Sequence, residues 1–321
     1  MTDQQRWEQA IAAFDQLIDR FGDDPNLQEQ VAWALTNKGA TLRQLGRVEE
    51  EVATYDEVVE RFADDAPPAF RPQVAKALLY RGVRLGELGR ADEEIASYEE
   101  LSLRFGDDHG LREPVAKALL YRGVRLGELG RVDEAVEVYE ELTVGFGDDP
   151  DLRRPVAKAL LYKGIRLSEI DRDDEAVAAY DELISRFGAD PDVREQVAKA
   201  LLYKGVLLSE LGRGEEAVAA YDDVVSRIGD DPDRTEQVTW ALVNKGVRLA
   251  ELGRGDEAVV VYDQVVERFG DHSDPAVREQ VAWALVNKGM TLGGLGAAPG
   301  LAASDAAPAA PTPAPRRTRS R

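Results

Sequence analysis

The chain has 321 residues, and 44% of them are hydrophobic, which is enough to bury a sizeable core. Its formal net charge of −21 repels phosphate backbones, so general nucleic-acid binding is disfavoured. The absence of Cys excludes disulfide bonds, thiolate-ligated zinc and cysteine nucleophiles. The N-terminus does not read as a signal peptide, and no stretch approaches the roughly 20 apolar residues that span a bilayer. We therefore expect a soluble, cytoplasmic protein without a membrane partner.

The first predicted element is a helix over residues 7–21, and a repeated segment follows it. Ala10 and Phe14 lie on one face of that helix. The string VAKALLYRGVRLGELGR occupies residues 74–90 and again 115–131, and weaker copies begin at Val31, Val156, Val197, Val238 and Val281. Successive copies start 43, 41, 41, 41, 41 and 43 residues apart. Such a period predicts stacked units, because one unit alone cannot bury its apolar face.

Each repeat predicts two helices. In residues 115–149, the first helix has an apolar face formed by Val115, Leu119, Leu126 and Leu129, and Gly130 follows where a left-handed cap is favoured. The second runs from about Asp133 to Phe146 and is closed by Gly147, with its apolar face on Ala135, Val138, Tyr139 and Leu142. Asp149, as a capping residue, and Pro150, in the first turn, then predict the start of the next helix. No strand pattern occurs, so the predicted fold is all-α.

The order Gly123, Leu126, Gly130, Ala135 and Tyr139 resembles the tetratricopeptide repeat (TPR). The resemblance covers residues 8–296 and implies an α-solenoid of antiparallel helix pairs forming a right-handed superhelix, with Gly123 packed against Ala135. The predicted solenoid, residues 1–296, comprises a lone second-type helix (7–21), six full repeats and a lone first-type helix (281–295). The period of 41 exceeds the family's usual length of about 34, which indicates a longer-period class. Arg or Lys also replaces the large apolar residue before the packing glycine, at Lys38, Arg81, Arg122, Lys163, Lys204, Lys245 and Lys288.

Residues 297–321 differ from the repeats in composition. They are rich in Ala and Pro, which cannot build a core, so we expect a disordered tail. Four Arg against one Asp make its tip basic. The basic tail could fold back on the acidic convex face or contact an acidic partner, but an inert linker is the preferred interpretation.

Few residues suggest catalysis. His109 and His272 lie in separate inter-repeat loops, where they are expected to be solvated. Acidic pairs such as Asp148 and Asp149 recur in the loops and predict helix capping. The recurring glycines lie within or at the end of helices, so they form no phosphate loop. We expect no enzymatic activity, no cofactor and no metal site.

A polar and aromatic stripe on the first-type helices is the candidate binding site. Lys117, Tyr121, Val124 and Glu128 share one helix face, distinct from the leucine face, and the pattern recurs in the other repeats. In TPR proteins the first helices line a concave groove, and these positions resemble those that contact peptide ligands. The predicted peptide-binding residues are Trp33, Asn37, Lys76, Tyr80, Lys117, Tyr121, Lys158, Tyr162, Lys199, Tyr203, Trp240, Asn244, Trp283 and Asn287.

The leading hypothesis is a protein-interaction scaffold that holds an extended or helical peptide in this groove. Tyr and Trp would supply stacking area, Asn would bond the peptide backbone, and Lys would attract acidic side chains. The same stripe could instead reflect duplication of a solvated surface. A second hypothesis is head-to-tail self-assembly, because the array begins with a second-type helix and ends with a first-type helix. A regulatory module of an enzyme system is the third.

Overall fold

The computed structural model describes residues 2–63, 67–229 and 231–294, and it is all-α across them. Fourteen α-helices and four short 3₁₀ turns occur in these ranges, without any strand. None of these helices is both long enough and apolar enough to cross a bilayer. The predicted tail, residues 297–321, lies outside the described residues.

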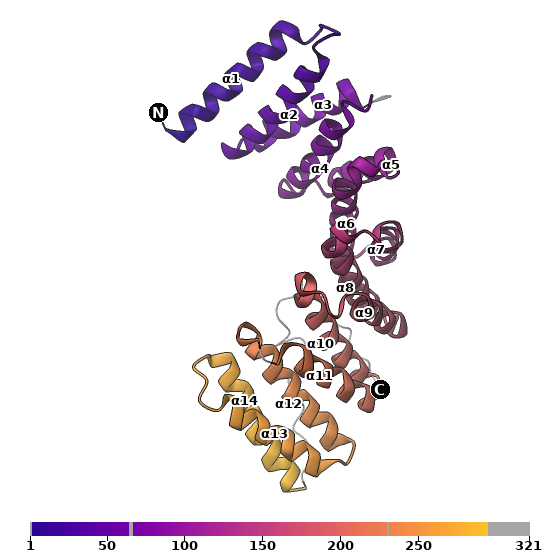
Figure 1. Ribbon diagram of the computed structural model, residues 1–321, viewed down its shortest axis with the longest axis vertical. Coiled ribbons are helices and arrows are strands. Elements are labelled where there is room, and N and C mark those ends of the chain that lie inside the picture. The colour runs from indigo at the N-terminus through magenta and orange to yellow at the C-terminus, as the bar shows by residue number, and fades with distance from the viewer. Residues whose placement is uncertain (1, 64–66, 230, 295–321) are drawn as a thin grey trace. The chain divides into compact units, whose positions relative to one another are not determined.

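The helices alternate between the two predicted types (Figure 1). The first-type helices are α2 (Gln28–Gln44), α4 (Arg71–Glu87), α6 (Arg112–Glu128), α8 (Arg153–Glu169), α10 (Arg194–Glu210), α12 (Thr235–Glu251) and α14 (Pro275–Leu292). The second-type helices are α1 (Asp3–Phe21), α3 (Val48–Phe62), α5 (Ala91–Phe105), α7 (Val132–Phe146), α9 (Asp173–Phe187), α11 (Gly214–Ile228) and α13 (Gly255–Phe269). The terminal helices α1 and α14 both begin earlier than their sequence patterns predict. Thr2 extends α1 through a capping box with Gln5.

A left-handed residue joins the two helices of a repeat. It is a glycine at Gly46, Gly89, Gly130, Gly212 and Gly253, and Gly294 follows α14 in the same conformation, with φ between 67° and 77°. The prediction for Gly130 is confirmed. Asp171 occupies the equivalent position in one repeat, with φ of 59°. Leu129, expected on the apolar face, caps α6 and is 45% exposed. Because α6 ends at Glu128, residue 129 does not continue the apolar face of the helix.

An acidic cap starts the first-type helices in the middle of the array. The Asp149 carboxylate accepts a hydrogen bond from the backbone N–H of Asp151 at 3.0 Å. It also accepts one from Arg112 at 2.7 Å, which ties the loop to the preceding first-type helix. Pro150 begins a 3₁₀ turn that leads into α8, so the predicted start signal is confirmed with one extra turn before the helix.

The core of each repeat contains a glycine that faces a tyrosine. A Cβ built on the glycine would lie 2.4–2.5 Å from the tyrosine Cε1 in six pairs: Gly39 and Tyr55, Gly82 and Tyr98, Gly123 and Tyr139, Gly164 and Tyr180, Gly205 and Tyr221, and Gly246 and Tyr262. All six tyrosines are at most 2% exposed. At Gly123 the nearest side chain is thus the ring of Tyr139, a contact that the sequence pattern did not predict. The expected packing of Gly123 against Ala135 stays a prediction.

Six of the seven basic residues that precede a packing glycine form a cross-repeat ion pair of the same kind. The partner of each is an acidic residue on the preceding second-type helix, at 2.5–2.7 Å in the pairs Lys38 with Asp15, Arg81 with Asp56, Arg122 with Glu99, Lys204 with Asp181 and Lys245 with Asp222. Lys288 and Asp263 form the same pair. These cations therefore bind the neighbouring second-type helix, which explains why the family's apolar residue is absent here.

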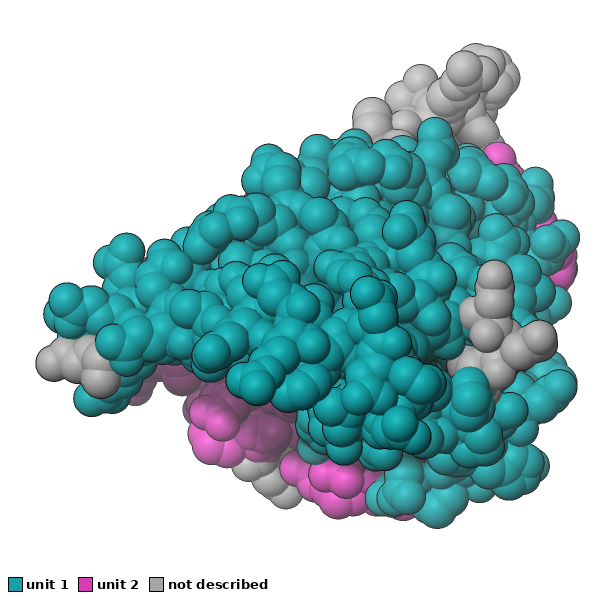
Figure 2. Space-filling view, turned by 90° about the horizontal axis from the view of Figure 1, so that it is seen from above, with its two compact units in different colours: residues 1–159 teal, residues 160–321 magenta. Residues whose placement is uncertain are grey.

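The chain divides into two compact units, residues 1–159 and 160–321, which Figure 2 shows in different colours. The division falls within α8. In each unit, the helices with the most extensive contacts are neighbours along the chain, such as α4 with α5 and α12 with α13. Each unit is therefore held together by contacts between successive helices, as stacking of repeats requires.

Candidate peptide-binding surface

The aromatic members of the stripe rest on the core tyrosines of the preceding second-type helices. Ring centroids are 6.3 Å apart for Tyr80 and Tyr55, and 5.9 Å apart for Tyr121 and Tyr98. In the second unit the pairs are Tyr203 with Tyr180 at 6.3 Å and Trp240 with Tyr221 at 6.0 Å. Part of each ring is thus used in packing, and only the remaining surface is available to a ligand.

Exposure differs sharply along the stripe. Trp33 and Tyr121 are 53% and 40% exposed, and Tyr80, Tyr162, Tyr203 and Trp283 are half-buried. Trp240 and Asn287 are only 4% and 1% exposed. The expectation that these two residues line an open groove is therefore not met, because packing already encloses their side chains. Burial also raises the pKa of the Tyr203 hydroxyl, for which the described part of the chain offers no hydrogen-bond partner.

The asparagines at the ends of the stripe bind their own helices. The side-chain nitrogen of Asn37 donates to the Trp33 carbonyl at 2.8 Å, and that of Asn244 donates to the Trp240 carbonyl at 2.9 Å. One donor of each amide is therefore occupied one turn back along the helix. Both asparagines are half-buried.

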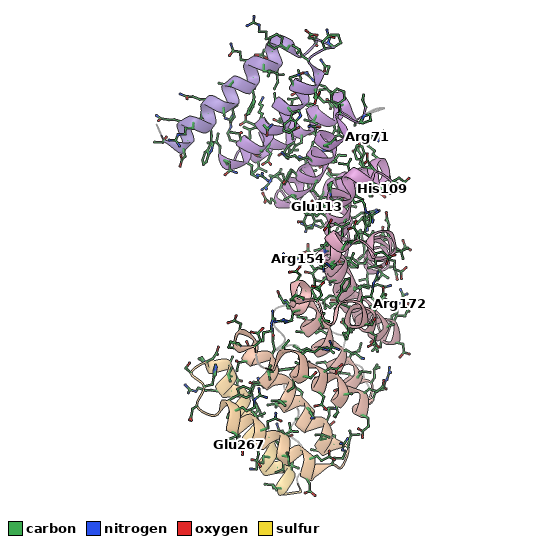
Figure 3. All side chains as sticks on the ribbon, viewed as in Figure 1. Arg71, His109, Glu113, Arg154, Arg172 and Glu267 are labelled. Atoms are coloured by element: carbon green, nitrogen blue, oxygen red, sulfur yellow. The ribbon has the colours of Figure 1, made fainter. Side chains whose placement is uncertain are left out.

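The stripe lysines fall into two groups. Lys117 and Lys199 donate to Glu113 and Glu195, one turn earlier, at 2.6 Å (Figure 3 labels Glu113). The Glu113 carboxylate raises the pKa of the Lys117 ammonium. Lys76 and Lys158 contact no carboxylate among the described residues, since Pro72 and Arg154 stand where the other two repeats have Glu. These two ammonium groups are available to an acidic ligand.

Two further residues shape the surface around α4. The Arg43 guanidinium lies over the Tyr80 ring, 4.7 Å from its centroid. With its amide oxygen turned toward Trp33, Gln73 accepts a hydrogen bond from the indole Nε1 at 2.9 Å. Sequence reasoning missed both. Only Gln73 has a sequence signal, because Gln280 follows Trp240 at the same 40-residue spacing.

The histidines lie in inter-repeat turns and not on the first-type helices (Figure 3 labels His109). His109 is exposed, as expected, whereas His272 is half-buried and its Nδ1 accepts from the Asp274 N–H at 3.2 Å. The described part of the chain contains no group of three or more side chains that could hold a metal ion.

Comparison with known proteins places the repeat in a family. A model of the tetratricopeptide repeat matches residues 3–67 and 163–233. None of the curated proteins compared matches the chain. Among solved structures, apo RapI is similar with a TM-score of 0.59 at 7% identity, covering 91% of this chain and 83% of that chain. BtubC from P. vanneervenii has a TM-score of 0.51 at 15% identity, covering 73% and 94%. YrrB, described as a TPR protein with an unusual peptide-binding site, has a TM-score of 0.46 at 15% identity, covering 70% and 96%.

The two solved structures with the higher TM-scores support the fold alone, because sequence identity to them is low. The family match falls on both units and coincides with the helix pairs of the structure. The repeated glycine–tyrosine contact and the positive-φ turn give each matched segment the same packing. Both units of the chain therefore contain tetratricopeptide repeats.

Proposed function

We propose that this chain is a non-enzymatic scaffold that binds a peptide segment of a partner protein along its first-type helices. TPR proteins serve in general as protein-interaction scaffolds. The observation that carries the proposal is the solvent exposure of Trp33 and Tyr121 on first-type helices. Large aromatic side chains of this kind are frequent anchors of protein interfaces.

The charges of the stripe indicate the chemistry of the ligand. Lys76 and Lys158 have no carboxylate partner among the described residues, so an acidic side chain could pair with either without breaking an existing contact. The preferred ligand is therefore a peptide with aromatic or aliphatic anchors and acidic residues. Trp240 and Asn287 are omitted from the contact surface, because both are buried.

Crosslinking at single positions tests the proposal with little disturbance to the fold. A photoreactive phenylalanine analogue replaces Tyr121 in one protein and Val144 in a matched control. Val144 lies on the second-type helix α7 and is 87% exposed, so both probes face solvent. We expect position 121 to capture specific partner peptides, identified by mass spectrometry, and position 144 to capture few.

Substitution of the exposed aromatics provides a second, independent measurement. We expect the double variant Trp33→Ala, Tyr121→Ala to bind the peptide identified by crosslinking at least tenfold more weakly than wild type. The double variant Leu103→Ala, Val144→Ala should bind it with unchanged affinity. Leu103 is 80% exposed on α5. Changing Tyr80 or Tyr203 would be less informative, since both rings are half-buried against core tyrosines, whereas Tyr121, which also contacts a core tyrosine, is 40% exposed. Equal crosslinking at positions 121 and 144 would contradict binding along the first-type helices.

A further inference from the structure

In every complete repeat a tyrosine ring packs against a glycine of the first-type helix, and we call the space beside that glycine the socket. The last helix, α14, has this glycine without a tyrosine packed against it. Gly289 stands where Gly246 stands in α12. A Cβ on Gly246 would lie 2.4 Å from the ring of Tyr262, whereas no atom of the described residues lies within 4 Å of a Cβ on Gly289. The socket is therefore formed by the sequence and left without its aromatic side chain.

The apolar surface around this socket is uncovered. Leu285, Val286 and Leu292 are 52%, 48% and 68% exposed. Their counterparts in α12, 43 residues earlier, are Leu242, Val243 and Leu249, which are all at most 4% exposed. The difference arises because α13 packs on α12, and no second-type helix of the described residues follows α14. Leaving three large apolar side chains in water is unfavourable, so a helix that covered them would gain stability from their burial.

The first helix, α1, carries the matching side chain. Phe14 lies 41 residues before Tyr55, at the tyrosine position of the repeat. The six core tyrosines are at most 2% exposed, but Phe14 is only half-buried, because no first-type helix of the described residues precedes α1. Ile11, Leu17 and Phe21 continue the register of Val52, Val58 and Phe62. Thus α1 has the side chains that a helix packed on α14 would need.

A row of ion pairs between successive second-type helices also has unmatched ends. Arg47 pairs with Glu8 at 3.3 Å, and Arg254 pairs with Glu215 at 2.7 Å. One repeat before Arg47 stands Arg6, and one repeat after Glu215 stands Asp256. Both end residues are exposed, and the ion pair that Arg6 forms among the described residues is with the exposed Asp3 of its own first turn, at 3.2 Å.

A row of hydrogen bonds from arginine side chains to backbone carbonyls also has unmatched residues at its two ends. Arg227 donates to the Gly188 carbonyl at 2.8 Å, and Arg268 donates to the Gly229 carbonyl at 2.9 Å. Arg20 on α1 and Gly270 after α13 are the next members at the two ends. Phe14, Arg6 and Arg20 therefore stand at the repeat positions that a second-type helix packed beside α13 and α14 would use.

We propose that α1 of one molecule packs on α13 and α14 of a second copy, so that the two half-repeats complete one full repeat. Phe14 fills the socket at Gly289, Arg6 pairs with Asp256 of the second copy, and Arg20 donates to the Gly270 carbonyl of the second copy. The contact is heterologous, since each molecule offers one end and receives the other. This assembly uses helix ends that the proposed peptide site does not use.

Two complementary variants test the proposal. Gly289→Leu fills the socket and leaves Phe14 intact, while Phe14→Glu removes the aromatic ring and leaves the socket intact. In sedimentation velocity over a concentration series, we expect wild type to associate. Each variant alone should have a dissociation constant raised at least about 30-fold, which corresponds to about 2 kcal/mol. An equimolar mixture should form a dimer and nothing larger, because each variant keeps one working end.

Controls separate loss of assembly from loss of folding. Gly289→Leu should melt as wild type does in dilute solution, whereas Gly246→Leu should melt at a lower temperature because its socket is occupied. A wild type that stays monomeric would overturn the proposal, and truncation after Gly294 would then show whether the chain's own tail covers the socket. Association that persists in Gly289→Leu, or a mixture without dimers, would equally overturn it.

Discussion

Each glycine–tyrosine contact depends on a missing side chain. At Gly123 the ring of Tyr139 occupies the volume that a Cβ would need, 2.4 Å from the ideal position. Gly145 offers a matched comparison, because it lies within the helix α7 and a Cβ built on it would meet no atom of the described residues within 4 Å. The two glycines therefore have opposite effects on stability. Gly123 leaves space for the Tyr139 ring in the folded state, whereas Gly145 only increases the conformational entropy of the unfolded chain.

We predict that Gly123→Ala and Gly145→Ala change stability in opposite directions. The first should lower the free energy of unfolding by about 1–3 kcal/mol through overpacking. The second should raise it by about 0.5–1 kcal/mol, since alanine loses less conformational entropy in a helix. Urea denaturation followed by circular dichroism measures both. Equal effects at the two positions would show that the Tyr139 contact does not constrain residue 123.

A buried carboxylate in α3 gives a second prediction at this scale. The Glu51 side chain is fully buried, and its nearest cation among the described residues is Arg84 at 3.4 Å. Burial raises the pKa of Glu51 above its ordinary value of 4.5. Four later repeats have alanine at this position: Ala135, Ala176, Ala217 and Ala258.

A raised folded-state pKa means that the folded chain binds this proton more tightly than the unfolded chain does. The stability that the group contributes is then present below pH 4.5 and is lost as pH rises through the folded pKa. We predict that Glu51→Gln is more stable than wild type at pH 7 and that the difference shrinks toward pH 4.5. Melts of the two proteins side by side cancel the effects of carboxylates they share. A difference that grows on acidification would contradict a raised pKa.

At the scale of the helix pair, the turn with Asp171 departs from its siblings. Glycine adopts positive φ without steric cost, whereas an L-residue crowds its Cβ against the following carbonyl. Asp171 adopts φ of 59°, while Gly130 in the preceding repeat adopts 74°. Both positions join a first-type helix to its second-type partner.

We predict that Asp171→Gly stabilises the protein by about 1 kcal/mol and that the reciprocal Gly130→Asp destabilises it by a similar amount. Thermal melts of both variants, and of the double variant, check the prediction. The double variant should return close to wild type, because the two turns lie in different repeats and their effects should add. A destabilised Asp171→Gly would mean that the aspartate side chain compensates for its strain.

How far the sequence predicts this structure can be followed along one repeat. Apolar spacing identifies the helix faces, and Gly130 and Asp149 mark where helices end and begin, because caps are local in sequence. Packing partners are not local. The spacing shows that Gly123 faces a second-type helix, but the contact with Tyr139 depends on how the helices slide past one another. The sequence shows only that an acidic residue, Glu99, stands 23 residues before Arg122. The ion pair between them is seen in the structure.

The predicted binding stripe shows the same limit. Helical spacing places its residues on one face of each first-type helix, yet it cannot show how deeply a neighbouring helix covers that face. Trp33 and Trp240 have the same position in the repeat, but their exposures are 53% and 4%. Their different environments arise from the neighbouring helices, and only the three-dimensional structure reveals which tryptophan a ligand can reach.

For the whole molecule, the ion pairs make the net charge of −21 compatible with close stacking. Acidic side chains on second-type helices face basic side chains on the next first-type helices, as in Asp56 with Arg81 and Asp222 with Lys245. Like charges on successive second-type helices are therefore separated by a row of cations. Exposed pairs contribute only about 0–1 kcal/mol each, so apolar burial supplies most of the stability.

Contacts between neighbouring helices also determine how damage spreads. In each unit the extensive contacts fall on helices one or two places along the chain. A disrupted repeat should therefore loosen its neighbours and leave distant repeats folded, as nearest-neighbour coupling in a solenoid implies. We predict that Gly82→Leu, which forces α4 away from Tyr98 in α5, increases amide hydrogen exchange in α3 to α6. Helices α12 to α14 should keep wild-type protection, measured by mass spectrometry on the same samples. A uniform rise in exchange along all helices would instead mean that the array unfolds as one cooperative body.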